Sequence, residues 1–120
     1  MGYQINGERL IRNLFTMAHF GQNEGGGIDR SLGSQADYDT REWLKGYWKE
    51  HLKEEPETDP IANLWCRHKG VQNRKPIVIG SHHDAVPDGG KYDGAMGVLI
   101  ATEVMETIVE HGILLKHPLY

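Results

Sequence analysis

With 120 residues, 13 basic and 17 acidic side chains, the chain has room for one small domain and carries a formal net charge of −4. Its basic residues are outnumbered and dispersed, which excludes the concentrated positive surface of a nucleic-acid-binding protein. The single cysteine, Cys66, excludes an internal disulfide framework and is typical of a reducing cytosol. No apolar stretch approaches the ~20 residues of a membrane span, and the start lacks the features of a signal peptide. We therefore expect a soluble, cytoplasmic, globular protein.

The first half of the sequence predicts two helices. Residues 6–19 have a capping residue, Asn6, followed by apolar side chains at intervals of three and four residues. The glycine-rich residues 21–33 are typical of a flexible connector, with a segment that lines a site as the alternative. Ser34 then resembles the first residue of a capping box, and it precedes a second predicted helix over residues 36–52.

The second half predicts two strands, a helix and the start of another strand. Residues 61–67 alternate loosely between turn signals, as strands do. Residues 76–80 form a short β-branched run that predicts a strand buried on both faces. Residues 93–111 have the broad apolar face of a helix, and the apolar residues 114–120 resemble the beginning of a further strand. This element order indicates an α/β layer architecture, and so few strands make the sheet incomplete within the chain.

Polar chemistry gathers in residues 80–94, between the predicted buried strand and the last helix. Ligands of open α/β sheets bind beyond the carboxyl ends of the strands, where this loop lies. His82 and Asp84 are two residues apart and point to the same side of an extended segment. Imidazole and carboxylate both bind divalent metals, and a nearby carboxylate can instead hold the ring of a ligating histidine. Asp93 stands at the mouth of the helix, where its two oxygens can bridge a pair of ions.

Each of these residues also has an ordinary structural explanation, since Asp93 can cap a helix and His82 and Asp84 can be surface residues. Together, however, His-x-Asp after a strand and Gly-Gly-x-x-Asp-Gly before a helix favour a metal site. The chain does not complete that site with the carboxylates of the last helix, because at ~1.5 Å per residue they lie ~15–25 Å along its axis from Asp93. These carboxylates are Glu103, Glu106 and Glu110. The chain thus supplies only part of the roughly four ligands of a stable zinc site.

The stretch GSHHDAVPDGGKYDGAMGVLIATEVMETI resembles the first metal-binding motif of the aminoacylase-like dinuclear metallopeptidase superfamily. It is most similar to the branch of N-carbamoyl-L-amino-acid hydrolases, allantoate amidohydrolases and β-ureidopropionases. The segments INGERL, GGGIDR and DPIANLWCRHKG resemble the same branch. The resemblance therefore covers almost the whole chain.

This resemblance implies a site and a reaction. His82 would bind one metal, Asp93 would bridge two, and Asp84 would orient His82, while His83 falls at a variable position and is expected to be a bystander. The cofactors would be two divalent ions of zinc, manganese, cobalt or nickel. The substrate would be a small carbamoyl or ureido compound, cleaved at a C–N bond, and the full-length enzyme would be a homodimer. Ala85 and Ala62 depart from the common residues of the branch, Thr and Gly, and both changes look tolerable.

Members of the branch are several times longer than this chain, and further ligands and a Glu-Glu pair follow the matching part. The resemblance thus implies that residues 1–120 are the N-terminal fragment of a three-layer catalytic domain with a mostly parallel sheet. The lid or dimerisation domain and the C-terminal half would be absent, and we expect the chain alone to be inactive. One alternative is a non-catalytic or vestigial interaction fragment that keeps the fold. Another, a phosphate-binding module, is disfavoured because neither G-x-G-x-x-G nor G-x-x-x-x-G-K-[ST] occurs.

Overall fold

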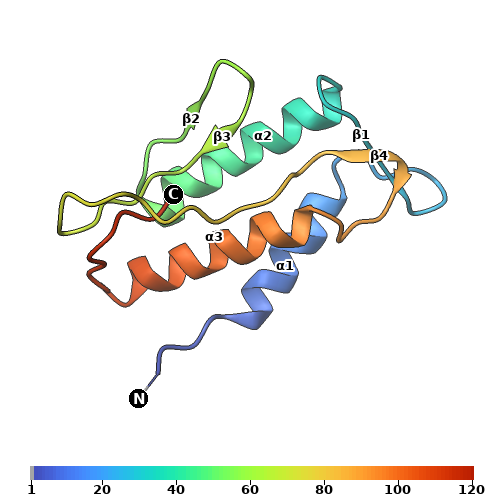
Figure 1. Ribbon diagram of the computed structural model, residues 1–120. Helices are drawn as coiled ribbons and strands as arrows, with labels where there is room; N and C mark the ends of the chain where they lie inside the picture. Colours follow the sequence, from blue (N-terminus) through green and yellow to red (C-terminus); the bar gives the residue numbers. More distant parts are fainter. Residues whose placement is uncertain (1) are drawn as a thin grey trace.

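The structure is a computed structural model that describes residues 2–120. It combines the helices α1 (Gly7–Ala18), α2 (Gln35–Tyr47) and α3 (Ala95–Glu110) with short β-ribbons and extended segments (Figure 1). Helix α3 packs against α1 and against η1 (Trp48–Leu52), the π-helical turn that continues α2. No helix among residues 2–120 is long and apolar enough to cross a bilayer.

The helix starts follow from local hydrogen bonds that the sequence predicted. The Asn6 side chain accepts from the Arg9 N–H at the start of α1, and the Ser34 hydroxyl accepts from the Asp37 N–H at the start of α2. Each cap satisfies a backbone donor that has no partner within the helix. The predicted helix over residues 36–52 is confirmed as α2 and η1 together, ending at Lys53 with φ 58°.

Two antiparallel ribbons connect distant parts of the chain. Strand β1 (Ile28–Arg30) pairs with β4 (Ala85–Gly89), and β2 (Glu57–Thr58) pairs with β3 (Leu64–Trp65). Figure 1 shows β1 and β4 side by side. The glycine-rich residues 21–33 therefore contain a paired strand, and the expectation of a flexible connector was wrong. The predicted loop over residues 80–94 likewise contains β4. The sequence did not predict this strand because its partner, β1, lies far away in the chain.

The prediction of a buried strand over residues 76–80 was also wrong. Ile77 and Val78 are 54% and 58% exposed, and Ile77 makes only an isolated bridge to Leu119. The β-branched run is exposed because no segment of residues 2–120 covers its outer face. Of the tail predicted to begin a strand over residues 114–120, only Leu119 forms β-bridges, to Ile77 in parallel and to His68 in antiparallel orientation, and residues 116–117 form a bend. Ile77–Leu119 is the only parallel pairing among the described residues.

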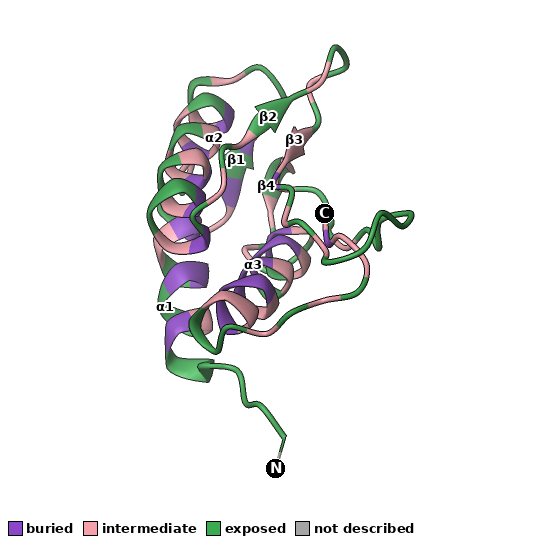
Figure 2. Ribbon diagram, turned by 90° about the vertical axis from the view of Figure 1, so that its left-hand side faces the viewer, coloured by how far each residue is buried: buried purple, intermediate pink, exposed green. Residues whose placement is uncertain are grey.

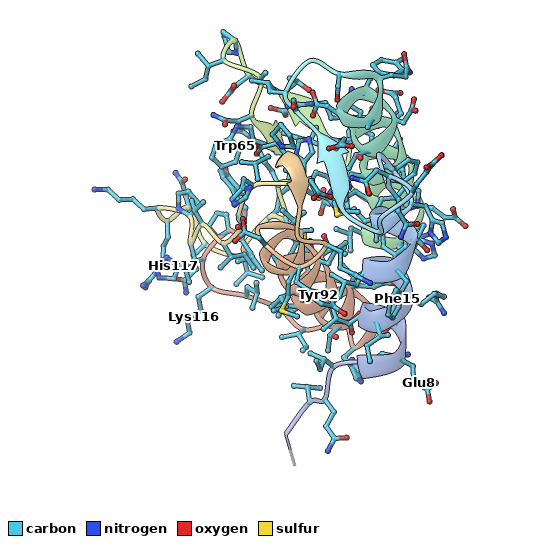
Figure 3. The ribbon with its side chains drawn as sticks, turned by 90° about the vertical axis from the view of Figure 1, so that its right-hand side faces the viewer. Glu8, Phe15, Trp65, Tyr92, Lys116 and His117 are labelled. Atoms are coloured by element: carbon cyan, nitrogen blue, oxygen red, sulfur yellow. The ribbon has the colours of Figure 1, made fainter. Side chains whose placement is uncertain are left out.

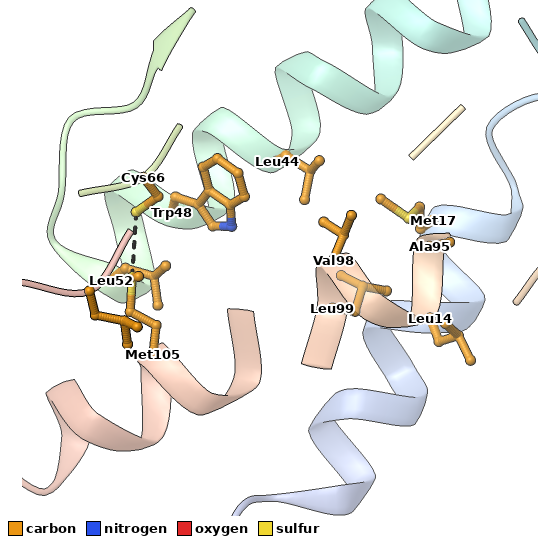
Figure 4. Packing of buried hydrophobic residues seen from close by; sticks show 11 residues of the cluster. Leu14, Met17, Leu44, Trp48, Leu52, Cys66, Ala95, Val98, Leu99 and Met105 are labelled. Carbon is orange, nitrogen blue, oxygen red and sulfur yellow. Dashed lines mark hydrogen bonds between the residues drawn. The ribbon is translucent and has the colours of Figure 1, made fainter. Parts of the chain in front are cut away.

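The hydrophobic core lies where the three helices meet the extended segments. Figure 2 shows the buried stretches of α1 and α2 facing α3, and Figure 4 shows the side chains that fill this space. The core residues are Leu14, Met17, Leu44, Trp48, Leu52, Cys66, Ala95, Val98, Leu99, Met105 and Leu119. Each large apolar side chain contributes about 1.5–3 kcal/mol when fully buried. Burial raises the pKa of the Cys66 thiol to about 12, so this cysteine is an unreactive core residue.

A buried ionic cluster holds α1 against α3, and we call it the Arg9 cluster: Arg9, Tyr47, Glu103, Glu106 and Glu110. The Arg9 Nε donates to Glu103 Oε2 at 2.7 Å, and its Nη2 donates to Glu103 Oε1 at 2.8 Å. Arg9 Nη1 lies 3.1 Å from Glu106 Oε1 and also contacts Glu110. The Tyr47 hydroxyl donates to Glu106 Oε2 at 2.6 Å. The carboxylates of α3 are thus used in helix packing, in agreement with their exclusion from the metal site.

Candidate metal centre

The three residues of the predicted site come together around one imidazole ring. His82 Nδ1 lies 3.3 Å from Asp84 Oδ1 and 3.1 Å from the Asp84 carbonyl oxygen. On the other edge of the ring, His82 Nε2 lies 3.5 Å from Asp93 Oδ2. The ring is therefore bracketed by two carboxylates, one at each nitrogen.

Glycines at the start of α3 allow this approach. Gly94 has φ 69°, and a Cβ placed there would lie 2.3 Å from the His82 ring and from the His82 carbonyl oxygen. A Cβ on Gly97 would lie 2.6 Å from the Ser81 Cβ. The first turn of α3 thus packs directly against residues 81–82, and Asp93, which directly precedes Gly94, lies close to the His82 ring. Gly94 itself is the N-cap residue of α3, so the alternative of Asp93 as the cap does not apply.

The geometry fits a metal ligand pair. Two ligands held at ~2.0–2.1 Å from a tetrahedral ion lie roughly 3.3–3.4 Å apart, close to the 3.5 Å between His82 Nε2 and Asp93 Oδ2. When Nδ1–H donates to Asp84, the lone pair of the neutral ring is on Nε2, which faces Asp93. The ligand set is nevertheless partial: within residues 2–120, no three His, Cys, Asp or Glu side chains form a group that could hold an ion.

The candidate residues are open to solvent. The side chains of His82, Asp84 and Asp93 are 51%, 50% and 85% exposed. Beside them lies an apolar groove of about 660 Å³, bounded by α2, η1, α3, β3 and residues 78–84. His82 and Asp84 contribute to the wall of this groove. A ligand can therefore reach the imidazole and the carboxylates directly.

His83 is largely buried away from Asp93, and the structure gives it a partner that sequence reasoning missed. Its side chain is 13% exposed, and Nε2 lies 2.6 Å from Asp37 Oδ1. Burial lowers the pKa of His83, and the hydrogen bond to Asp37 only partly offsets this effect. Because an ionised carboxylate only accepts, His83 donates its Nε2–H to Asp37. The alternation of an extended segment was the one signal that could have predicted this inward orientation.

The remaining histidines lie away from the candidate centre or have other contacts. His68 Nδ1 is 2.8 Å from Glu54 Oε1, and His51 Nδ1 is 3.5 Å from Glu106 Oε1 in the Arg9 cluster. His19 Nδ1 contacts the Phe15 carbonyl at 2.7 Å. Figure 3 shows His117 beside Lys116 on a projecting segment, well separated from Phe15 of α1. None of these histidines joins His82 and Asp93.

Figure 3 also shows Tyr92 near Phe15, where the loop before α3 meets α1. The Lys91 ammonium lies 5.5 Å from the centre of the Phe15 ring and 5.8 Å from that of Tyr92. Such cation–π contacts hold this part of the loop on the surface of α1. They position the chain immediately before Asp93.

Comparison with known proteins finds no matching family model but clear relatives. The chain is 33% identical over 117 residues to an N-carbamoyl-L-amino-acid amidohydrolase of Rhizobium meliloti, covering 97% of this chain and 28% of the relative. It is 34% identical over 100 residues to an allantoate amidohydrolase of Bacillus subtilis, covering 78% of this chain and 23% of the relative. The chain thus spans less than a third of the length of these relatives.

Solved structures agree with the sequence relatives. The structure of a hydantoinase/carbamoylase family amidase from Burkholderia ambifaria superposes with a TM-score of 0.91 and 36% identity. That match covers 98% of this chain and 29% of the other. The resemblance predicted from the sequence motifs is confirmed: in sequence and in fold, nearly the whole chain is related to the N-carbamoyl-L-amino-acid and allantoate amidohydrolases of the hydantoinase/carbamoylase family.

Proposed function

We propose that the chain is the metal-binding part of an amidohydrolase that cleaves C–N bonds of carbamoyl or ureido compounds. N-Carbamoyl-L-amino acids and allantoate are the substrates suggested by the names of its relatives. The observation that carries the proposal is the bracketed imidazole: Asp84 lies at Nδ1 of His82 and Asp93 lies at Nε2. Both the residue types and the spacing fit a divalent metal.

Each residue has a defined task in this proposal. His82 would hold one ion, Asp93 would supply the carboxylate shared by two ions, and Asp84 would accept a hydrogen bond from His82 Nδ1–H. This hydrogen bond keeps Nε2 unprotonated and turned toward Asp93. When bound, two divalent ions of zinc, manganese, cobalt or nickel supply an activated water and polarise the scissile carbonyl. The exposure of Asp93 leaves its carboxylate free for this role.

The rest of the ligand set and the general base would come from outside residues 1–120. We propose that the chain is the N-terminal fragment of a three-layer catalytic domain with a mostly parallel sheet. The parallel bridge between Ile77 and Leu119 is compatible with the start of such a sheet. The chain alone would then be inactive, and the complete enzyme would be a cytoplasmic homodimer. The proposal that the chain is a fragment is supported by its coverage of only 28% of the Rhizobium meliloti relative and by its partial ligand set.

A chimera tests this function. This chain would replace the matching segment of the Rhizobium meliloti relative, and ammonia release from an N-carbamoyl-L-amino acid would be measured after metal loading. We expect turnover in the chimera, loss of turnover on Asp93→Ala within it, and none from the isolated chain. A folded chimera without metal-dependent turnover would contradict the proposal. Robust turnover by the isolated chain, abolished by Asp93→Ala, would refute its inactivity alone.

A non-catalytic interaction fragment is the second candidate. It is favoured by exposed apolar side chains at the open strand edge and tail, since Ile77, Val78 and Leu114 are 54%, 58% and 80% exposed. Such surfaces commonly mark contacts with another chain. Light scattering coupled to gel filtration distinguishes the readings: a stable assembly favours the interaction fragment, and a strictly monomeric, well-folded protein counts against it.

A further inference from the structure

The metal motif assigns no role to Arg30, yet this residue is buried at the edge of the candidate centre. Arg30 is 1% exposed and is the largest of the fully buried side chains. It belongs to β1, at the position that pairs with Ala85 of β4. A guanidinium is removed from water at high cost unless acceptors replace the lost hydration. The hydrogen-bond acceptors around the Arg30 guanidinium therefore indicate which parts of the chain this buried side chain holds together.

Those acceptors connect two segments that are distant in sequence. Arg30 Nε donates to the His83 carbonyl at 2.7 Å. On the other side, Nη1 donates to the Met17 carbonyl at 3.0 Å and to the Phe20 carbonyl at 2.9 Å. Carbonyls at the C-terminal end of a helix lack intrahelical partners and carry the negative end of its dipole, so they favour a cation. One side chain thus ties the end of α1 to the backbone between His82 and Asp84.

Asp37 fixes the side chain of His83, the residue whose carbonyl accepts from Arg30. Its Oδ1 accepts from His83 Nε2 at 2.6 Å and from Arg41 Nε at 3.0 Å, and its Oδ2 accepts from the Gly33 N–H at 2.9 Å. Asp37 is 4% exposed and lies in the first turn of α2, where the helix dipole favours a carboxylate. The ring and the backbone of His83 are therefore both fixed.

Anchoring His83 has a direct consequence for its neighbours. Successive side chains of an extended segment point to opposite sides. With His83 held inward, His82 on one side of it faces Asp93, and Asp84 on the other side contacts the His82 ring. The ligand pair and its supporting carboxylate then keep their spacing without any direct contact from Arg30 or Asp37 to an ion.

We propose that Arg30 and Asp37 are positioning residues for the candidate metal centre. Arg30 fixes the backbone of His83, Asp37 fixes its ring, and together they hold His82 and Asp84 in a geometry ready to bind an ion. The effect on metal affinity rests on the proposed function, whereas the effect on the order of residues 81–84 does not. The planar fork of arginine is essential because a lysine ammonium cannot reach acceptors on opposite sides at once.

The test compares two buried arginines. Arg30→Lys is the variant, and Arg9→Lys is its matched control, because Arg9 is 6% exposed and belongs to the Arg9 cluster between α1 and α3. In the metal-free proteins, ¹⁵N relaxation gives backbone order parameters for residues 81–84. We expect values near ~0.85 in the wild type and the control, and below ~0.6 in Arg30→Lys.

Cobalt(II) provides the second readout, through its visible absorption and its dissociation constant, measured in the chimera with the Rhizobium meliloti relative because the isolated chain supplies only part of the ligand set. Residues that support metal ligands typically change affinity by about 10–100-fold, so we expect Arg30→Lys to weaken Co²⁺ binding by that factor with an altered spectrum. Arg9→Lys should keep the affinity and the spectrum of the wild type. Asp37→Asn should shift both in the direction of Arg30→Lys.

The outcomes separate the two claims. A folded chimera with the unaltered chain that binds no Co²⁺ refutes the proposed metal function, while the order parameters of the isolated chain still decide whether Arg30 positions the loop. Unchanged order and unchanged affinity in a folded Arg30→Lys protein would overturn the positioning role. If Arg30→Lys does not fold, Arg30→Met, which buries no charge, is judged by the same two readouts. Failure of both variants to fold would make Arg30 a requirement of the whole fold and would also overturn the proposal.

Discussion

The Arg9 cluster and the candidate metal centre both place carboxylates beside nitrogen-bearing side chains, but they differ in how far those carboxylates are buried. In the cluster, Glu103 and Glu106 are 2% and 3% exposed and pair with Arg9 and Tyr47. In the candidate centre, the Asp84 and Asp93 side chains are 50% and 85% exposed and face a single imidazole. Carboxylates whose acceptors are already occupied hold helices together, and carboxylates left open to solvent are available to a ligand. Residue type alone does not distinguish the two regions; burial and pairing do.

The largest expected effect is in the Arg9 cluster. Arg9→Met removes the only cation that contacts Glu103 among the described residues and leaves a buried carboxylate without its partner. Breaking a buried ion pair in this way costs about 3–5 kcal/mol, and urea denaturation measures the loss. Lys45→Met, at the exposed pair with Glu42, is the control and should cost below about 1 kcal/mol. Similar losses in both variants would contradict the comparison.

At the candidate centre, the largest effect on stability is expected at Gly94. Gly94→Ala combines a φ of 69° with a Cβ 2.3 Å from the His82 ring, so both the backbone and the ring must shift. We expect a loss of roughly 1–3 kcal/mol together with weaker Co²⁺ binding. Gly7→Ala serves as the control, because a Cβ there meets nothing within 4 Å. Unchanged Co²⁺ binding in Gly94→Ala would show that the position of the ring does not matter to the site.

The pH dependence of stability should report the Arg9 cluster. Burial alone would raise the pKa of Glu103, but hydrogen bonds from Arg9, the Asn6 N–H and Thr107 outweigh it, and the pKa is lowered from 4.5. The stabilisation is therefore fully present above pH 4.5 and is lost as the pH falls through the lower folded-state value. Urea denaturation between pH 7 and 3 should show this decline, and Glu103→Gln should flatten it. An equally steep decline in Glu103→Gln would assign the effect to other groups.

Sequence reasoning succeeded where structure is local. The caps at Asn6 and Ser34 depend on hydrogen bonds to residues three positions away, and a short motif placed Asp93 beside His82. The β1–β4 ribbon was missed because residues 28–30 pair with residues 85–89, and neither segment has a strand-like pattern. The exposure of Ile77 and Val78 was missed because a β-branched run predicts a strand but does not show which other segments cover its faces.

The support of the candidate centre could not be predicted for the same reason. Arg30 contacts His83 across 53 positions, and Asp37 contacts His83 across 46. No spacing rule connects such pairs in a single sequence. Arg30 in GGGIDR looked like part of a connector, and only the fold shows that its guanidinium reaches the backbone beside His82.

The smallest expected change in stability, and the most direct test of the account, comes from the ligand pair itself. Isothermal titration with Co²⁺, carried out in the chimera that supplies the remaining ligands, would compare the wild-type chain with His82→Ala, Asp93→Ala and the control His19→Ala, an exposed histidine outside the site. Because the altered side chains at the site are at least half exposed, all variants should keep the free energy of unfolding of the wild type within about 0.5 kcal/mol. We predict that the wild type and His19→Ala bind Co²⁺ with the same affinity, and that His82→Ala and Asp93→Ala lose this binding. Equal Co²⁺ affinity in all four proteins, or none in the wild type, would contradict the assignment of His82 and Asp93 as a metal-binding pair.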